Sequence, residues 1–221
     1  VTMLLGAGAD VNQATTDDGV TPLFGASWKG HAEVVKMLLG AGADVDKART
    51  DDGSTPLFMA SQEGHTEVVK MLIGAGADVN KAATDDGQTP VYAASRRGHA
   101  EVVKMLLGAG ADVNKARTDD GETPLSISAW ALNDAAALAM VHLLAMAGAN
   151  LAHVADDGRT AAMNAADTDK PLTAAWLDSV AALSPIQICA SLGDGAGLEA
   201  LLRRQECDPF ARHPTTPALA E

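Results

Sequence analysis

The feature that most constrains this chain is an internal repeat. The string Thr-Asp-Asp-Gly begins at Thr16, Thr50, Thr84 and Thr118, so each copy starts 34 residues after the previous one. A period of this size is typical of supersecondary units that stack and bury their hydrophobic faces against one another. The chain has 221 residues and is only 3% aromatic, so aliphatic side chains must form most of a core shared by several units.

The first complete unit predicts two short helices followed by an extended link. Thr21 and Pro22 form a helix-start signal, because a threonine hydroxyl caps the first turn and proline lacks the N–H that is unpaired there. Gly30 ends this helix, and a second helix starts near His31. Apolar residues recur in it at helical spacing, namely Val34, Val35, Leu38 and Leu39. Glycines close the second helix, and Asp-Asp-Gly forms a turn in the link.

Three copies share a set of motifs in a fixed order. Each carries Thr-Pro-Leu (Thr-Pro-Val in the third), then Gly-His, Glu-Val-Val and Gly-Ala-Asp-Val-Asn, over residues 19–46, 53–80 and 87–114, with Asp46 as the last residue of the first copy. This pattern resembles the ankyrin repeat, and weaker copies extend the resemblance over nearly the whole chain. The resemblance implies an all-α solenoid, an ankyrin repeat stack of helix-turn-helix units with extended hairpin fingers.

The chain departs from the family pattern in two ways. The ankyrin period is usually 33 residues, so the finger here is one residue longer. The family's usual histidine after Thr-Pro-Leu is replaced in every copy, by Phe24, Phe58, Tyr92 and Ser126. We therefore expect the side-chain hydrogen bonds of that histidine to be absent or replaced by packing.

The pattern divides the chain into units. We expect a partial repeat at 1–15, regular repeats at 16–49, 50–83 and 84–117, an expanded repeat at 118–154, a short divergent repeat at 155–183, a repeat at 184–215 and the start of a truncated repeat at 216–221. The chain thus begins and ends inside repeats, as a slice of a longer array or of a larger protein would. Uncapped ends expose apolar stacking surface, and we expect some self-association through them.

The second half is irregular. The expanded repeat contains four additional residues and lacks the Gly-His between its helices, which predicts a longer first helix or an enlarged loop. In the next unit we expect the second helix at 172–183, with a shortened or missing finger. In the unit after that, Ser184 caps a helix that starts at Pro185, and three leucines line the core, namely Leu198, Leu201 and Leu202.

The copies differ from one another mainly on one side of the unit. The resemblance implies that fingers and first helices line a concave recognition surface. The variable positions there, with their counterparts in the fourth unit, are the candidate partner-binding residues: Val20, Trp28, Lys29, Ser54, Gln62, Glu63, Gln88, Arg96, Arg97, Glu122 and Trp130. Tryptophan and arginine are enriched in interface hot spots, which favours recognition over neutral drift. A further variable set, Gly25, Met59 and Ala93, is attributed to packing.

Paired aspartates recur in the fingers and form a predicted acidic ridge: Asp17, Asp18, Asp51, Asp52, Asp85, Asp86, Asp119 and Asp120. Catalytic carboxylates must converge on one substrate with separated pKa values, whereas adjacent residues on a turn diverge. The loops also lack the spaced ligands of an EF-hand. We interpret the pairs as solvated turns whose combined charge could steer a basic partner.

The composition excludes several other classes of function. A net charge of −13 argues against nucleic acid or an anionic membrane as partner. The most apolar stretch, 129–149, is interrupted by polar residues and predicts a buried helix.

Two cysteines, Cys189 and Cys207, are too few for a disulfide framework and indicate reduced thiols in an intracellular, cytoplasmic protein. Histidines, cysteines and glycines follow the repeat rather than a metal, nucleophile or phosphate site, so we expect neither cofactor nor enzymatic activity.

Three functions remain open at this point. The first is a protein-interaction scaffold that binds a partner protein or peptide on the concave face. The second is the non-catalytic arm of a larger enzyme or channel. The third follows from the resemblance, because the asparagine that ends Gly-Ala-Asp-Val-Asn is a target of asparaginyl hydroxylation in this family. Asn12, Asn80 and Asn114 occupy that position, where asparagine could equally serve to tie the turn backbone.

Overall fold

The structure is a stack of helix pairs, seen in a computed structural model that describes residues 3, 6–181, 183 and 185–193. Within these ranges the regular elements are all helices, without a strand. The pairs are α2 (Pro22–Trp28) with α3 (Ala32–Gly40), α4 (Pro56–Glu63) with α5 (Thr66–Gly74), α6 (Pro90–Arg97) with α7 (Ala100–Gly108), α8 (Pro124–Ala131) with α9 (Asp134–Met146), and α10 (Ala161–Asp167) with α11 (Pro171–Val180), followed by α12 (Pro185–Leu192). The expected all-α solenoid is confirmed.

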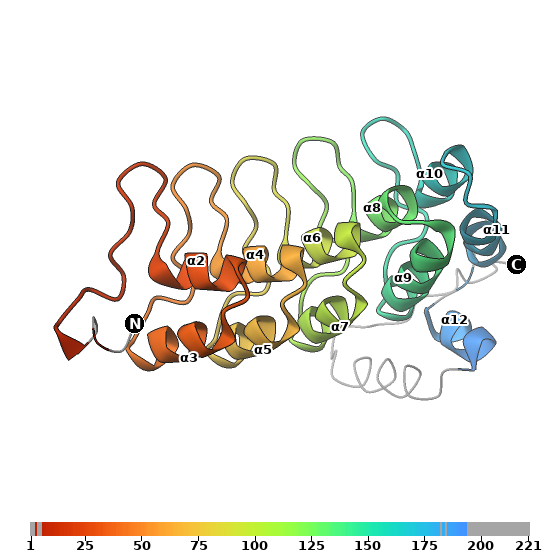
Figure 1. The fold of residues 1–221 in the computed structure, drawn as a ribbon. Helices are drawn as coiled ribbons and strands as arrows, with labels where there is room; N and C mark the ends of the chain where they lie inside the picture. The colour runs from red at the N-terminus through yellow and green to blue at the C-terminus, as the bar shows by residue number, and fades with distance from the viewer. Residues whose placement is uncertain (1–2, 4–5, 182, 184, 194–221) are drawn as a thin grey trace, which may run out of the picture.

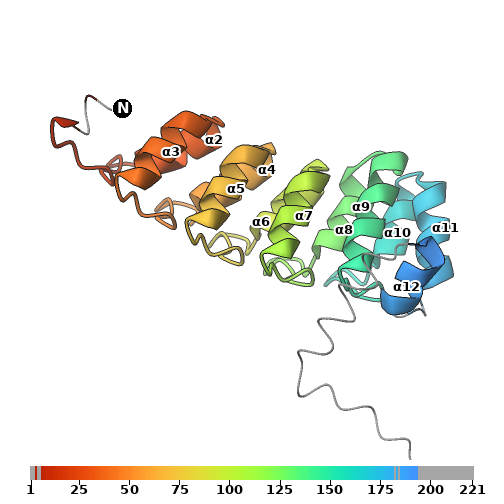
Figure 2. The same ribbon diagram turned by 90° about the horizontal axis from the view of Figure 1, so that it is seen from below.

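The pairs form two rows of helices with the fingers on one side. The first helices α2, α4, α6, α8 and α10 contact one another in sequence, as do the second helices α3, α5, α7, α9 and α11. Figure 1 shows the fingers extending from the row of first helices, away from the second helices. Figure 2, viewed from below, shows the pairs following one another as successive layers. The fingers and first helices therefore share one side of the stack.

The first helices begin as their sequence predicts. In α2, α4, α6, α8 and α10 the hydroxyl oxygen of the preceding threonine accepts the N–H three residues later, and proline is the first helical residue in all but α10. Gly64 and Gly98 follow α4 and α6 with φ angles of 77° and 80°, a left-handed conformation that glycine adopts without steric cost. In the divergent unit Asp169 takes this conformation instead, at φ 56°.

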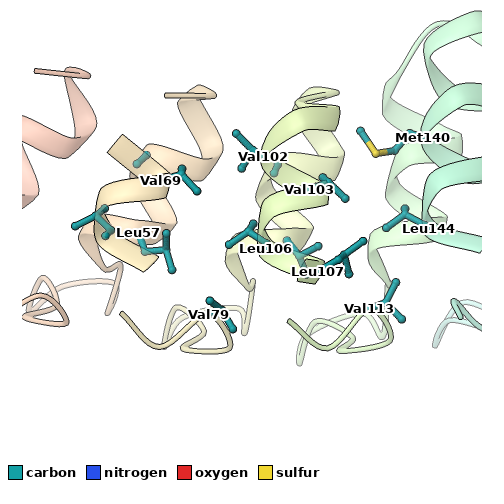
Figure 3. Close-up of a cluster of buried hydrophobic side chains, with 14 of the residues drawn as sticks. Leu57, Val69, Val79, Val102, Val103, Leu106, Leu107, Val113, Met140 and Leu144 are labelled. Atoms are coloured by element: carbon teal, nitrogen blue, oxygen red, sulfur yellow. The ribbon is translucent and has the colours of Figure 1, made fainter. Parts of the chain in front are cut away.

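The hydrophobic core lies between the two rows and runs through successive repeats. It is built from aliphatic residues that recur at equivalent positions, such as Leu72 and Leu106, each 0% exposed. Figure 3 shows leucine, valine and methionine side chains from α4 to α9 meeting in one continuous cluster. Each repeat buries its apolar surface on its neighbours, so the stability of the array depends on contacts between repeats.

Successive fingers are joined by main-chain hydrogen bonds. The N–H groups of Thr50, Thr84, Thr118 and Asp156 donate to the carbonyls of Asp18, Asp52, Asp86 and Asp120, at 2.8–3.0 Å. Each finger is thereby held on the preceding one. The glycine of each turn, for example Gly53, lies so close to the next finger that a β-carbon would come within 2.5 Å of Thr84.

A second ladder runs along the Gly-Ala-Asp-Val-Asn segments. The side-chain oxygens of Asn12, Asn80 and Asn114 accept the main-chain N–H of Asp44, Asp112 and Asn150 in the next repeat, at 2.7–2.8 Å. The amide nitrogens of Asn80 and Asn114 also donate to the carbonyls of Gly110 and Gly148. These contacts support the reading that asparagine ties the backbone here, while hydroxylation of these residues stays a prediction.

Asp46 is the exception in this ladder. Its two carboxylate oxygens each lie 3.2 Å from the N–H of Asp78, and a carboxylate has no proton to donate toward Gly76. Asp46→Asn is therefore expected to raise the free energy of unfolding by about 0.5–1.5 kcal/mol, the usual value of one added hydrogen bond. Urea denaturation of the two proteins measures the difference.

The reverse change provides the control for this prediction. Asn80→Asp removes the donor to Gly110 and should lower stability by a similar amount. If both substitutions shift the midpoint in the same direction, the missing hydrogen bond does not account for the difference in stability.

The expanded repeat differs from both expectations for it. α8 has 8 residues, as α4 and α6 do, but α9 has 13 residues where α7 has 9. The four additional residues thus lengthen the second helix, and the prediction of a longer first helix or an enlarged loop is wrong. The reason is a strong start signal, because the side chain of Asn133 caps α9 by accepting the N–H of Ala136 at 3.0 Å.

The divergent repeat and the unit after it agree with the sequence in part. The second helix, α11, occupies Pro171–Val180 rather than 172–183. α12 begins at Pro185 shortly after it, which leaves no room for a full finger, as expected. Ser184, the core leucines Leu198, Leu201 and Leu202, and the truncated unit at 216–221 lie outside the described residues.

Candidate protein-binding surface

The candidate partner-binding residues lie on the side formed by the first helices and the bases of the fingers, here called the finger face. Trp28, Gln62, Arg96 and Trp130 come from the last turns of α2, α4, α6 and α8, and contacts between successive first helices place them in one row along the stack. Trp28 is 43% exposed and Trp130 is 55% exposed, which is high for such large apolar side chains. Lys29, Glu63 and Arg97 accompany this row and are exposed.

A second row stands at the finger bases and is less accessible. It consists of Val20, Ser54, Gln88 and Glu122, each directly before a capping threonine. Val20, Gln88 and Glu122 are partly exposed, whereas Ser54 is only 3% exposed. Ser54 therefore offers almost no surface to a partner, and its place in the predicted set is not supported by its burial.

Hydrogen bonds between repeats fix the backbone under the tryptophan row. His65 Nε2 donates to the Trp28 carbonyl at 3.0 Å, and His99 Nε2 donates to the Gln62 carbonyl at the same distance. In the divergent repeat Lys170, which is 5% exposed, donates from Nζ to the Trp130 carbonyl at 2.7 Å. The recurrent histidines thus have the single structural role that their repetition predicts. His65 and His99 hold the ends of α2 and α4 on the next unit and fix the backbone of the row there.

Part of the finger face is closed by apolar packing. Phe24, Phe58, Met59 and Ala93 pack with Ala83 and the partly buried Val20. The packing interpretation of Met59 and Ala93 is consistent with this cluster, and two of the residues that replace the family's histidine contribute rings to it. The guanidinium of Arg49 lies 5.6 Å from the centre of the Phe24 ring and covers it.

Further along the stack the finger face opens into a pocket between α6 and α8. Its volume is about 320 Å³, and its lining comes from both helices and the finger between them: Tyr92, Arg96, Arg117, Asp120, Glu122, Ile127 and Trp130. Tyr92 stands at the histidine position and retains a polar contact, since its hydroxyl donates to Glu122 Oε2 at 3.1 Å. The structure thus brings three predicted partner-binding residues, Arg96, Glu122 and Trp130, and Asp120 of the predicted acidic ridge into one concave site.

The charged groups around this pocket are unequally paired. Arg117 forms ion pairs with Asp120 at 2.9 Å, with Asp119 and, in the preceding finger, with Asp86 at 3.4 Å. Glu122 forms no ion pair within 4 Å in the described part of the chain, and burial raises its pKa above the usual range. Burial and then the charge of Glu122 raise the pKa of the Tyr92 hydroxyl, so it remains a hydrogen-bond donor.

The paired aspartates form turns, as their sequence predicts. In four fingers the second aspartate accepts the N–H two residues later, for example Asp52 from Ser54 at 2.9 Å and Asp120 from Glu122 at 3.0 Å. The first aspartate of each pair is exposed to solvent. Arg49 pairs with Asp51 and Asp52, and Arg117 neutralises part of the charge further along. The combined action of Asp17, Asp18, Asp85 and the rest as an acidic ridge stays a prediction.

Sequence reasoning missed Arg49, Tyr92 and Arg117. The sequence did contain a signal for the two arginines. The residue directly before Thr-Asp-Asp-Gly is an arginine in every second finger, since successive copies have Thr15, Arg49, Ala83 and Arg117 there. Each arginine lies over the aromatic ring in the first helix of its own repeat, Phe24 or Tyr92. The single tyrosine of the chain was a second signal, since a hydroxyl at a packing position requires a partner.

Two other kinds of site were predicted to be absent, and the described part of the chain contains neither a metal cluster nor a membrane-spanning helix. Its residues contain no cluster of three or more histidine, cysteine or acidic side chains able to hold a metal ion. Among the described helices, none combines the length and hydrophobicity that a bilayer crossing requires. Cys189 lies in α12, and Cys207 lies outside the described residues.

Comparison with known proteins agrees with the repeats and the helix pairs. A search of curated proteins gave no match. The family model for ankyrin repeats in three copies matches residues 1–83 and 77–151. This match spans more than half of the 221 residues, so the chain belongs to the ankyrin repeat family.

Proposed function

We propose that this chain is a protein-interaction scaffold whose finger face binds another protein. The observation that carries the proposal is the exposure of two tryptophans, Trp28 at 43% and Trp130 at 55%, in one row on a rigid backbone. Exposed tryptophan is uncommon on a surface that stays in water, and it is enriched among the residues that contribute most binding energy. Ankyrin repeats are in general protein-interaction modules, which agrees with this proposal.

The distribution of sequence differences supports the same surface. The copies stay alike where they stack, as in the histidine–carbonyl contacts and the asparagine ladder. They differ along the tryptophan row, where the side chains read Trp28, Gln62, Arg96 and Trp130. A scaffold whose contacts between repeats are constant, while the side chains on one exposed face vary, is suited to recognising a partner with an irregular surface.

The charge of the chain favours a partner with a basic surface. The net charge is −13, and the exposed aspartates at the fingertips lie beside the proposed binding face. Such a field raises the rate of association with a cationic protein and opposes association with nucleic acid. We further propose an intracellular, cytoplasmic setting, and self-association through the ends of the array stays a prediction.

A capture experiment tests the proposal. The full chain and its Trp28→Ala/Trp130→Ala variant are used as bait in a native cell extract, and bound proteins are identified by mass spectrometry. Both tryptophans are exposed, so the variant should fold, and circular dichroism checks this. We expect the parent chain to capture at least one protein. The variant should retain that protein in an amount lower by about tenfold or more.

The matched control lies on the opposite row of helices. Glu67→Ala/Lys70→Ala changes two exposed residues of α5 without altering net charge, and it should retain the partner fully. Loss of binding in the α5 variant alone, or equal capture by all three baits, would place the interface elsewhere on the chain.

A further inference from the structure

We infer that the pocket between α6 and α8 receives one basic side chain, lysine or arginine, of the bound partner. This inference rests on the proposed function and specifies its anchor point. It depends on three features of the pocket, which are an exposed aromatic platform, a carboxylate that forms no ion pair with the described residues, and an excess of negative charge.

The apolar part of the pocket fits the stem of a long basic side chain. Trp130 is 55% exposed and forms one wall, while Ile127 and Tyr92 are buried beneath the surface. Lysine and arginine bury their methylene groups along such surfaces and keep the charged head near polar groups. A cation over the face of tryptophan gains additional electrostatic attraction, and tryptophan is the aromatic side chain best suited to this contact.

The carboxylate of Glu122 is available to the charged head. One of its oxygens accepts the Tyr92 hydroxyl at 3.1 Å, and the other lies 3.5 Å from Asn164 Nδ2, which is a weak contact. Each carboxylate oxygen accepts about two hydrogen bonds, so capacity remains on both. Glu122 is also partly buried, and a partly buried carboxylate gains more from a nearby cation than an exposed one does.

The remaining charges favour a cation over an anion. The guanidinium of Arg117 lines the pocket but is already shared among Asp86, Asp119 and Asp120. Arg96 is exposed, and water screens its charge. With Glu122 the pocket and its ion pairs hold four carboxylates against two guanidiniums, so an incoming carboxylate meets net repulsion.

The inference can be tested without knowing the partner. Blocked pentapeptides Gly-Ser-X-Ser-Gly, with X as lysine, arginine, norleucine or glutamate, are titrated into the ¹⁵N-labelled full chain. The chain has three tryptophans, Trp28, Trp130 and Trp176, so its indole N–H signals form a small and resolvable set. Trp130→Phe assigns the relevant signal. We expect the lysine or arginine peptide to shift the Trp130 indole signal in a saturable way, and the norleucine and glutamate peptides to leave it in place.

Two variants connect the shift to the carboxylate. Glu122→Gln keeps an acceptor for the Tyr92 hydroxyl but removes the negative charge. We expect it to lower the affinity for the basic peptide about tenfold. Glu67→Gln removes an exposed charge from α5, on the opposite row of helices and outside the pocket, and should leave the affinity unchanged. Equal shifts by the norleucine or glutamate peptide, or equal affinity in Glu122→Gln, would overturn the inference.

The outcome is separable from that of the proposed function. If basic peptides fail to bind while capture still depends on Trp28 and Trp130, the finger face binds a partner but its anchor is not a basic residue. If basic peptides bind the pocket while capture is unaffected by the tryptophan substitutions, the pocket accepts a basic side chain but the captured protein does not bind the finger face, so the proposed function fails.

Discussion

Gly64→Ala is expected to lower the free energy of unfolding by about 2–3 kcal/mol, a large effect for a single added methyl group. Gly64 follows α4 with φ 77°, a conformation that costs an L-residue with a β-carbon about 1–2 kcal/mol. The new β-carbon would lie 2.6 Å from the ring of His99, well inside contact distance. The ring must move, which weakens its 3.0 Å hydrogen bond to the Gln62 carbonyl.

The chain contains a control glycine for this prediction. Gly74 ends α5 with ordinary helical geometry, and a β-carbon there would meet no atom within 4 Å. Gly74→Ala should be neutral or stabilising by up to about 1 kcal/mol, because alanine has the higher helix propensity. Thermal and urea denaturation compare the variants. Equal stabilities for Gly64→Ala and Gly74→Ala would show that the histidine contact between repeats does not constrain the structure.

Leu106→Ala is expected to have the largest effect on stability, a loss of about 3–5 kcal/mol. Leu106 is 0% exposed and belongs to the core that runs between the repeats. Truncation leaves a cavity bounded by residues of neighbouring units, and interiors packed at this density relax only partly. The substitution therefore weakens the interfaces on which the cooperative stack depends.

The comparison for Leu106 is a leucine of the same helix row with less burial. Leu39 in α3 is only partly buried, so Leu39→Ala should cost roughly 1 kcal/mol. Urea unfolding measures the free energy of unfolding of both variants. Following it by circular dichroism and by tryptophan fluorescence also tests whether the array unfolds as one unit, because the two curves then coincide. A loss at Leu106 no larger than that at Leu39 would contradict the continuous core described above.

The regular units were predictable because each local signal acts within its own repeat. Threonine followed by proline starts the first helix, and a glycine in the left-handed conformation ends it, as at Thr55 and Gly64. The period of 34 residues then requires that copies of this unit stack. The expanded repeat was harder, since the loss of Gly-His removed the marker between its helices. Asn133 and Asp134 were the remaining start signal, and they place the additional residues in α9.

The candidate site was predictable only in outline. Variation among copies identified the row that contains Trp28 and Trp130, because that comparison needs only the repeat register. The pocket depends on contacts between residues that are distant in the chain. Tyr92 and Glu122 are 30 residues apart, and Arg117 reaches back to Asp86. Ser54 illustrates the opposite difficulty, since its position varies among copies although the residue is buried at 3% exposure. Variation alone does not distinguish an accessible position from a buried one.

The central claim, that the finger face holds another protein, is tested most directly by photocrosslinking. The photoreactive residue p-benzoylphenylalanine is placed at Trp130 on the finger face or at Lys70 on the opposite row, and each full chain is irradiated in native extract. We expect a discrete crosslinked protein from position 130 and none from position 70. Crosslinking of the same protein from position 70, with none from position 130, would contradict it.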